Sequence, residues 1–302
     1  MSRKKNLFIS FSGGETSAFM TIWILENIRH LYNEIVIVFA NTGQENEETL
    51  LFVQRCSEHF CFDVVWVEAV VNPESNKGTK HKVVDFETAS RNGEPFEEVI
   101  KKYGIPNPDW LHCTRELKTA PMYSYIRSIG WKKADFHVAI GIRIDEIGRA
   151  DDKADKKGII YPLITMVPVI KSHINGWWKE QPFRLNLKGY QGNCKWCWKK
   201  GMRKHLTILN ENPEFFDFPE RMEELYGMNG VIHNEEPRVF FRDKISTKQL
   251  RGFAKVGHFT PADDDSRVYP EPDMFGYKLD INSGCAESCE VLFGDFEDEV
   301  IE

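Results

Sequence analysis

The stretch Ser12–Ser17 (SGGETS) carries residue types that suit the binding of a phosphate group. It follows an apolar run at 7–11 and opens a helical pattern over 16–28. Gly13 and Gly14 allow the backbone to approach an anion closely, and the start of the helix adds positive potential. The alternative is a tight strand-to-helix turn capped by a serine. Further donors for phosphate oxygens are the hydroxyl groups of the stretch: Ser12, Thr16 and Ser17.

Cations further along the chain could converge on the same anion: Arg115, Lys118, Arg143 and Arg149. The first two lie three residues apart at the start of a helical pattern, so we expect them on one face. Gly141 and Arg143 follow a predicted strand. Arginine offers bidentate contacts to phosphate, and lysine offers a point charge. Asp145 and Glu146 could hold Arg143 or bind Mg²⁺, and a surface ion pair is the other interpretation of each cation.

The cysteine spacing is the second chemical signal. Thiolates for a metal or cluster could come from four of these residues: Cys113, Cys194, Cys197, Cys285 and Cys289. Cys194 and Cys197 have C-x₂-C spacing, and Cys285 and Cys289 have C-x₃-C spacing. Four thiolates suit either a 4Fe–4S cluster or Zn²⁺. Cys56 and Cys61 are interpreted instead as small buried hydrophobic residues.

The segment Lys195–His205 (KWCWKKGMRKH) interleaves basic residues with two tryptophans. Such a pattern can hold a nucleotide or a nucleic-acid strand through charge and stacking. The alternative is a helix with a cationic outer face whose tryptophans pack beneath the cysteine site. Trp177 and Trp178 are expected in the core or in a pocket wall.

The order of apolar and helical patterns predicts the fold. Short apolar runs that read as buried parallel strands lie at 7–11, 35–39, 64–67 and 136–140. Helical patterns alternate with them at 16–28, 45–60 and 117–129. This alternation predicts an α/β fold with a doubly wound parallel sheet. Ligands bind beyond the carboxyl ends of such strands, so Ser12–Ser17 and the turn 41–43 should face one pocket.

Polar segments interrupt this pattern. Residues 71–92 are interpreted as an excursion with a flexible tip that could act as a lid, and 148–158 as a mobile charged loop. Towards the C-terminus the alternation gives way to a mostly helical or irregular region, and the acidic tail at 295–302 is expected to fray. We therefore divide the chain into an α/β domain at 1–190 and a cysteine-containing region at 191–302 packed on it.

Composition narrows the class of protein. The 302 residues are 41% hydrophobic and carry a net charge of −7. The negative charge argues against a protein that binds nucleic acid over most of its surface. No apolar run is long enough for a membrane span, and the charged start MSRKKN lacks the apolar stretch of a signal peptide. We expect a cytoplasmic protein. Seven cysteines in that compartment favour metal, cluster or redox use over disulfides.

Taken in series, the motifs resemble a known family. FSGGETSAFM is similar to the pyrophosphate loop of the adenine-nucleotide α-hydrolase superfamily, whose fold is Rossmann-like. The whole order resembles the phosphoadenosine phosphosulfate reductase family, especially its phage-type members, for which the compartment would be the host cytoplasm. The remaining segments that carry the resemblance are FANTGQENEETLLFV, HCTRELKTAP, AIGIRIDEIGR followed by YPL, and GNCKWCWKK.

The resemblance implies specific roles. The turn after the second strand would contact base and ribose through Ala40, Asn41 and Thr42, while Gly141 and the cations would lie at the phosphates. Iron–sulfur members bind a 4Fe–4S cluster through a Cys-Cys pair and a later C-x₂-C. Cys113 matches the first cysteine of that pair and Thr114 replaces the second, which leaves Cys285 or Cys289 as the substitute. The Glu-Cys-Gly motif that ends the dedicated reductases is missing.

These observations lead to one main expectation and three alternatives. The main one is an enzyme that binds ATP or a related adenine nucleotide with Mg²⁺, splits the α–β phosphate bond, and adenylates an acceptor or drives sulfur or group transfer. A sulfonucleotide reductase would use Cys285 or Cys289 as nucleophile. A nucleic-acid modification component would dock a strand on Lys195–His205. A nucleotide sensor without catalysis is the last alternative.

Overall fold

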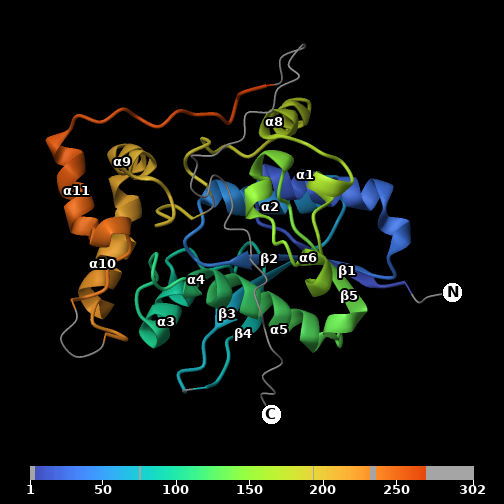
Figure 1. Ribbon diagram of the computed structural model, residues 1–302, viewed down its shortest axis with the longest axis horizontal. Coiled ribbons are helices and arrows are strands. Elements are labelled where there is room, and N and C mark those ends of the chain that lie inside the picture. The colour runs from blue at the N-terminus through green and yellow to red at the C-terminus, as the bar shows by residue number, and fades with distance from the viewer. Residues whose placement is uncertain (1–3, 75, 193, 232–235, 270–302) are drawn as a thin grey trace.

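The structure, a computed structural model, describes residues 4–74, 76–192, 194–231 and 236–269. Within these residues a central sheet is covered by helices on both faces (Figure 1). The strands are β1 (Asn6–Ser10), β2 (Ile35–Asn41), β3 (Val64–Val70), β4 (Lys80–Val84), β5 (Phe136–Ala139) and β6 (Ile159–Ile160).

Six strands of the described chain form one sheet in the order β4-β3-β2-β1-β5-β6. Every neighbouring pair is parallel except β3 and β4. From β1 the chain winds outward through β2 and β3, and it then returns to pair β5 with the other side of β1. The direction of winding therefore reverses between β1 and β5, which is where open α/β sheets form a ligand crevice. The predicted doubly wound α/β fold is confirmed.

Helices pack on both faces of the sheet because both faces of its strands are apolar. Leu7 and Ile9 belong to a core shared with α1, α2 and α8, whereas Phe8 and Val38 belong to a core shared with α5. The helices of this part are α1 (Glu15–Asn27), α2 (Glu47–Phe60), α3 (Glu94–Tyr103), α4 (His112–Thr114), α5 (Ala120–Ser128), α6 (Ala154–Lys157), α7 (Pro162–Thr165) and α8 (Lys171–Lys179).

Two polar segments differ from the prediction. The supposed lid at 71–92 contributes β4, which pairs antiparallel with β3 from Val70↔Lys80 to Trp66↔Val84. Its alternating charged residues suit an edge strand, where one row of side chains stays in water. The supposed loop at 148–158 contains the short helix α6, and β6 follows it. β4 has only two apolar residues and β6 is only two residues long, so neither gives an apolar pattern long enough to predict a strand from sequence.

The later part of the described chain is helical. It contains α9 (Met202–Glu211), α10 (Asp217–Tyr226) and α11 (Thr247–Val256), which stand beside the sheet in Figure 1. These helices share an apolar core with Phe96 and Val99 of α3. The C-terminal helices thus pack directly on the α/β part. No helix of the described residues has the length and apolar character needed to cross a membrane.

Candidate functional site

The loop between β1 and α1 is a tight turn held by its own hydroxyl groups. Ser12 Oγ donates to Ser17 Oγ at 2.9 Å, and Ser17 Oγ donates to the Gly14 carbonyl at 3.0 Å. Gly13 has φ +80°, and a Cβ there would lie 2.8 Å from Thr49 Cγ2, so only glycine fits. Residues 13–17 are buried. The loop is therefore a glycine-dependent turn that its own hydroxyl groups brace, and it lies under a cover of protein.

Glu15 places a carboxylate at the start of α1, inside this loop. Arg184 neutralises it through two hydrogen bonds, from Nε to Oε1 at 2.9 Å and from Nη2 to Oε2 at 2.8 Å. The Leu185 backbone N–H adds a third at 3.1 Å. Arg184 was missed from the sequence. The available signal was Glu15 itself, because a buried carboxylate requires a cationic partner.

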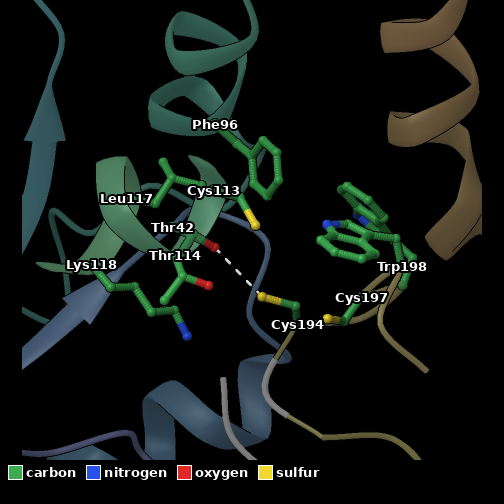
Figure 2. A pocket seen from close by; sticks show the side chains of 10 residues that line it. Thr42, Phe96, Cys113, Thr114, Leu117, Lys118, Cys194, Cys197 and Trp198 are labelled. Atoms are coloured by element: carbon green, nitrogen blue, oxygen red, sulfur yellow. Dashed lines mark hydrogen bonds between the residues drawn. The ribbon is translucent and has the colours of Figure 1, made fainter. Parts of the chain in front are cut away.

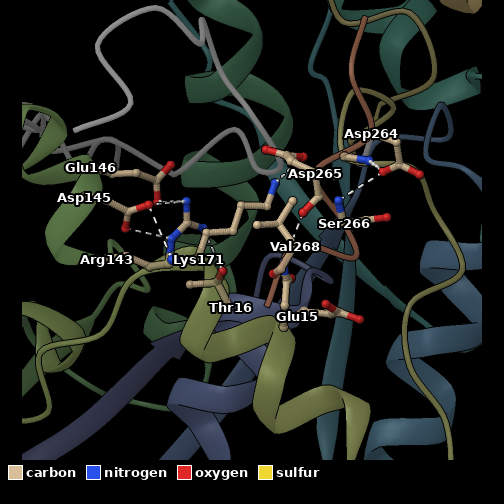
Figure 3. A network of polar contacts seen from close by, with 12 residues as sticks. Glu15, Thr16, Arg143, Asp145, Glu146, Lys171, Asp264, Asp265, Ser266 and Val268 are labelled. Atoms are coloured by element: carbon tan, nitrogen blue, oxygen red, sulfur yellow. Dashed lines mark hydrogen bonds and ion pairs between the residues drawn. The ribbon is translucent and has the colours of Figure 1, made fainter. Parts of the chain in front are cut away.

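The segment after β5 reaches the same loop. A Cβ on Gly141 would lie 3.3 Å from Ser17 Cα, so the two crossover connections touch. The Arg143 side chain is 2% exposed, and its Nη1 donates to Thr16 Oγ1 at 3.0 Å. Sequence reasoning proposed both Gly141 and Arg143, and the structure brings both to the loop, at the point where the winding of the sheet reverses. Figure 3 shows Arg143 beside Thr16.

The carboxylates after Arg143 are engaged with arginine. Asp145 Oδ1 lies 3.0 Å from Arg143 Nε, and Glu146 Oε2 lies 3.3 Å from Arg143 Nη2. Glu146 also pairs with Arg149, whose side chain is 30% exposed. Of the two roles left open for the carboxylates, holding the arginine is the one these contacts describe. Glu146 and Arg143 link Arg149 to the loop through a chain of ion pairs.

The turn after β2 is fixed by two buried carboxylates. Asn41 Nδ2 donates to Glu68 Oε1 at 2.6 Å, and Glu68 is fully buried. Thr42 donates to Glu45 through its backbone N–H and its Oγ1, each at 2.9 Å. Ala40 is also buried. The side chains expected to read base and ribose thus hold the turn in place, and sequence reasoning missed Glu45 and Glu68, whose strand and loop positions gave no periodic signal.

Three of the predicted cysteines line one pocket with Thr42: Cys113, Cys194 and Cys197. Figure 2 shows Cys113 facing the Cys194–Cys197 turn across this pocket. Backbone pairing of Glu45 with Cys194, and a 2.6 Å hydrogen bond from Trp196 Nε1 to Gln44 Oε1, dock that turn against the end of β2. The thiol pocket and the loop end of β2 are therefore one continuous region.

The thiol pocket has donors around it. Lys200 Nζ donates to the Cys194 carbonyl at 2.7 Å, and Lys199 Nζ donates to Thr114 Oγ1 at 3.2 Å. Trp198 also lines the pocket, and its buried Nε1–H has no acceptor among the described residues. In that part of the chain no three His, Cys, Asp or Glu side chains are grouped closely enough to hold a metal ion. Cys285 and Cys289 lie outside the described residues.

Arg115 and Lys118 do not share a face. Residues Arg115–Thr119 form a π-helical turn, in which side chains three apart point in different directions. The Lys118 side chain is buried and lines the thiol pocket, whereas the Arg115 side chain is 55% exposed and pairs with Glu116 at 2.7 Å. The expectation of one converging cluster was wrong for this pair, because ordinary helical spacing was assumed.

Other residues also differ from their predicted setting. In the segment Lys195–His205 both tryptophans are buried, with Trp196 1% and Trp198 4% exposed, so neither can stack on a nucleic-acid strand. The alternative is confirmed only for the tryptophans, which line the cysteine pocket: the helix α9 begins at Met202, and Lys200 is buried and not part of an outer cationic face. Cys56 is buried as expected, and burial raises the pKa of its thiol, but Cys61 is exposed. Trp178 lies in the core, as expected.

His205 closes the same segment. It is 2% exposed and packs against Phe216 and Phe241, with ring centroids 6.2 and 4.7 Å away. Burial, with a smaller effect of the nearby Lys200 charge, lowers the pKa of His205 to about 3. The histidine is therefore neutral at physiological pH and adds no charge to the basic segment.

Comparison with known proteins places the chain among uncharacterized relatives. No protein-family model matches it. It is 28% identical to uncharacterized protein MJ0066 of Methanocaldococcus jannaschii over 71% of its own length, and it spans only 40% of that protein. It is 31% identical to uncharacterized nin region protein ORF290 of Escherichia phage lambda over 294 residues, which cover 96% of each chain. The chain therefore belongs to the family of this phage lambda nin region protein.

Proposed function

We propose that the protein binds ATP or a related adenine nucleotide, with the polyphosphate on the loop Ser12–Ser17 and the adenosine towards the turn after β2. The observation that carries this proposal is the Arg143 guanidinium, buried 3.0 Å from Thr16 Oγ1 at the reversal point of the sheet. A buried cation beside a glycine turn and a helix start is an arrangement that favours a polyphosphate.

In the reaction we propose, an acceptor attacks the α-phosphorus of ATP. The bond between that phosphorus and the oxygen bridging to the β-phosphate breaks, the acceptor becomes adenylated, and pyrophosphate leaves. Backbone N–H groups of the loop and Arg143 would stabilise the negative charge that develops on pyrophosphate, and Mg²⁺, when bound, would supply further positive charge. Arg184 contributes by removing the repulsion that an unpaired Glu15 would exert.

A metal centre is part of this proposal. The thiols of Cys113, Cys194 and Cys197 line one pocket, but as they stand they are not grouped closely enough to hold a metal ion. A 4Fe–4S cluster or Zn²⁺ would therefore bind only after these thiols move together, with Cys285 or Cys289 as the fourth ligand. The pocket suits such a group because Trp198 Nε1–H needs an acceptor, and a ligated sulfur is one. When bound, a cluster would supply electron transfer or a sulfur environment beside the nucleotide, and Zn²⁺ would supply Lewis acidity or structure.

A second candidate function is sulfonucleotide reduction. It is favoured by Thr42, which belongs to the turn assigned to adenosine and also lines the thiol pocket, 3.9 Å from Cys194 Sγ. A reactive thiol near that pocket would therefore lie close to a bound nucleotide. Release of sulfite from a sulfonucleotide in the presence of a thiol donor would identify this activity.

Anaerobic incubation with ATP and Mg²⁺, followed by measurement of released pyrophosphate, tests the main proposal. We expect release by the wild-type protein and a loss of at least about 100-fold in Arg143→Gln, since the lost cation acts on developing charge. Arg29→Gln is the matched control, because Arg29 is exposed and follows the C-terminal end of α1, whereas the loop precedes the N-terminal end of that helix. If Arg143→Gln and Arg29→Gln are equally active, Arg143 does not bind the phosphates.

A further inference from the structure

Residues 261–269, which we call the strap, connect the C-terminal helices to the edge of the anion loop. The strap follows α11 and crosses towards α8, as the orange-red trace in Figure 1 shows. Near its beginning Arg203 donates to the Pro261 carbonyl and pairs with Asp263. The Ala262 N–H donates to Thr207 Oγ1 at 2.8 Å. These contacts anchor the first third of the strap on α9, away from the loop.

The other end of the strap is held by α8. Asn175, 2% exposed, donates from Nδ2 to the carbonyl oxygens of Asp265 at 3.0 Å and Val268 at 2.7 Å. Lys171 Nζ lies 2.8 Å from Asp265 Oδ1, with the lysine side chain 14% exposed. Two hydrogen bonds from the Asn175 side chain to backbone carbonyls, and one ion pair, thus hold the strap on α8.

Both sides of the anion loop are joined to these contacts. On one side the Lys171 N–H donates to Asp145 Oδ2 at 3.4 Å, and Asp145 holds Arg143 against Thr16 (Figure 3). On the other side Arg184, the partner of Glu15, donates from Nη2 to the Ser266 carbonyl at 2.8 Å. A cavity lined by Glu15, Gly189 and Ser266, among others, lies between strap and loop.

The strap therefore brings acid groups to the edge of a site built for anions. Asp264 accepts hydrogen bonds from the N–H groups of Gly189 at 2.9 Å and Ser266 at 3.0 Å. Asp265 approaches Gly189 so closely that a Cβ on that residue would collide with its carboxylate. The Asp265 carboxylate contacts the Lys171 ammonium group, and the Asp264 carboxylate accepts from a backbone N–H. Phosphate oxygens would make the same two kinds of contact. Loop residues 13–17 are buried, so an anion can reach them only if part of their cover moves.

We propose that the strap is a displaceable latch in which the Asp265 carboxylate occupies, on Lys171, the position of a phosphate group, and that Lys171 binds the polyphosphate once the latch has opened. This inference rests on the proposed function, and it adds a phosphate ligand and a control element to it. The ion pair between Lys171 and Asp265 costs little to break, because the Asp265 side chain is 45% exposed and pairs of that kind are weak. The remaining cost of opening is the loss of the Asn175 and Arg184 hydrogen bonds, which a bound polyphosphate has to offset.

Calorimetric titration of the full chain with ATP, and separately with inorganic pyrophosphate, tests the latch. Asp265→Asn removes the competing charge, so we expect both ligands to bind about fivefold more tightly than to wild type. Asn175→Ala, which loosens the strap without changing a charge, should also tighten binding. Lys171→Met should weaken it, and in the double variant Lys171→Met/Asp265→Asn the gain from Asp265→Asn should disappear. Urea unfolding verifies that each variant is folded.

Asp263→Asn is the matched control. Asp263 belongs to the same strap, but its side chain is 90% exposed and pairs with Arg203 on α9, so we expect wild-type affinity. Unchanged or weaker binding by both Asp265→Asn and Asn175→Ala, with normal binding by wild type, would overturn the latch and leave the nucleotide site intact. Absence of ATP and pyrophosphate binding in wild type and every variant would overturn both.

Discussion

At the residue scale, the charged side chains of the candidate site are held in place by partners that are far away in sequence. Arg143 is held by Asp145 but contacts Thr16, 127 residues away, and Glu15 meets Arg184 across 169 residues. Local spacing identified the loop hydroxyls because Ser12 and Ser17 lie close in sequence and hydrogen-bond each other. Arg143 was proposed from its place just after a predicted strand, and its contact with Thr16 has no local signal. Local spacing could not identify Arg184, since nothing near that arginine in sequence indicates where its chain segment will pack.

Trp198 offers a residue-scale test of the thiol pocket. Its Nε1–H is buried without an acceptor among the described residues, which costs free energy unless a sulfur ligand accepts it. We expect Trp198→Phe to leave metal content unchanged and to lower the reduction potential of an iron-bearing preparation, because a hydrogen bond to sulfur stabilises the reduced state. Electron paramagnetic resonance during a redox titration measures this.

Trp177→Phe is the control for that substitution. Trp177 packs against Phe19 and Phe60 in the core that α1, α2 and α8 share, which does not include the thiol pocket. An identical potential in wild type and both variants would show that Trp198 does not donate to the metal centre. A zinc-bearing preparation would give no electron paramagnetic resonance signal. In that case Zn²⁺ would be exchanged for Co²⁺, and the visible absorption of wild type and the two tryptophan variants would be compared.

At the element scale, the candidate site forms where two crossover connections leave the sheet side by side. The ends of β1, β2, β3 and β5 were predicted to within three residues, because strands buried on both faces leave a continuous apolar signal. The edge strand β4 left none, and β6, with two isoleucines, is too short for a pattern. The π-helical turn at Arg115–Thr119 was also hidden, since its backbone pattern has no distinctive composition.

The contact between the two crossovers predicts a strong effect at Gly141. A Cβ there would lie 3.3 Å from Ser17 Cα, so Gly141→Ala should push β5 away from the loop. We expect a loss of about 1–2 kcal/mol in the free energy of unfolding and weaker ATP binding. Gly148→Ala is the natural comparison, because a Cβ at Gly148 has no neighbour within 4 Å. Equal affinities and stabilities for the two variants would refute the close approach.

At the scale of the whole molecule, a second core ties the C-terminal helices to the α/β part. The buried tryptophans of the C-x₂-C turn and Phe96 of α3 belong to this core. Sequence patterns did not reveal it, because its aromatic residues come from short helices and turns without a common period. Its burial also explains why the basic segment is poorer in accessible aromatic rings than its sequence suggests.

This core makes stability depend on pH through His205. Burial lowers the pKa of His205 from 6.5 to about 3, so the unfolded chain binds a proton below pH 6.5 that the folded chain does not. Stability from this group is complete above pH 6.5 and falls as the pH drops towards 3, by about 1.4 kcal/mol per pH unit. Urea unfolding at pH 7.0 and 5.0 measures the effect.

His205→Phe should reduce that loss, because the titrating group is gone and phenylalanine suits its aromatic surroundings. Glu223 does not confuse the comparison: burial raises its pKa to about 7, so it gives stability that falls as the pH rises from 4.5 to 7, equally in both proteins. His30→Phe, at an exposed position, controls for losing a histidine. The same pH dependence in wild type and His205→Phe would contradict the buried neutral state.

The central claim is that Ser12–Ser17 binds the polyphosphate of an adenine nucleotide, and calorimetric titration of wild type, Ser12→Ala and Ser57→Ala with ATP tests it most directly. Ser12 and Ser57 are both partly buried serines whose hydroxyl groups donate a hydrogen bond, but only Ser12 lies in the loop. We predict saturable binding by wild type and Ser57→Ala, competition by pyrophosphate, and at least tenfold weaker binding by Ser12→Ala. Equal affinity in all three proteins, or no binding by wild type at millimolar ATP, would contradict it.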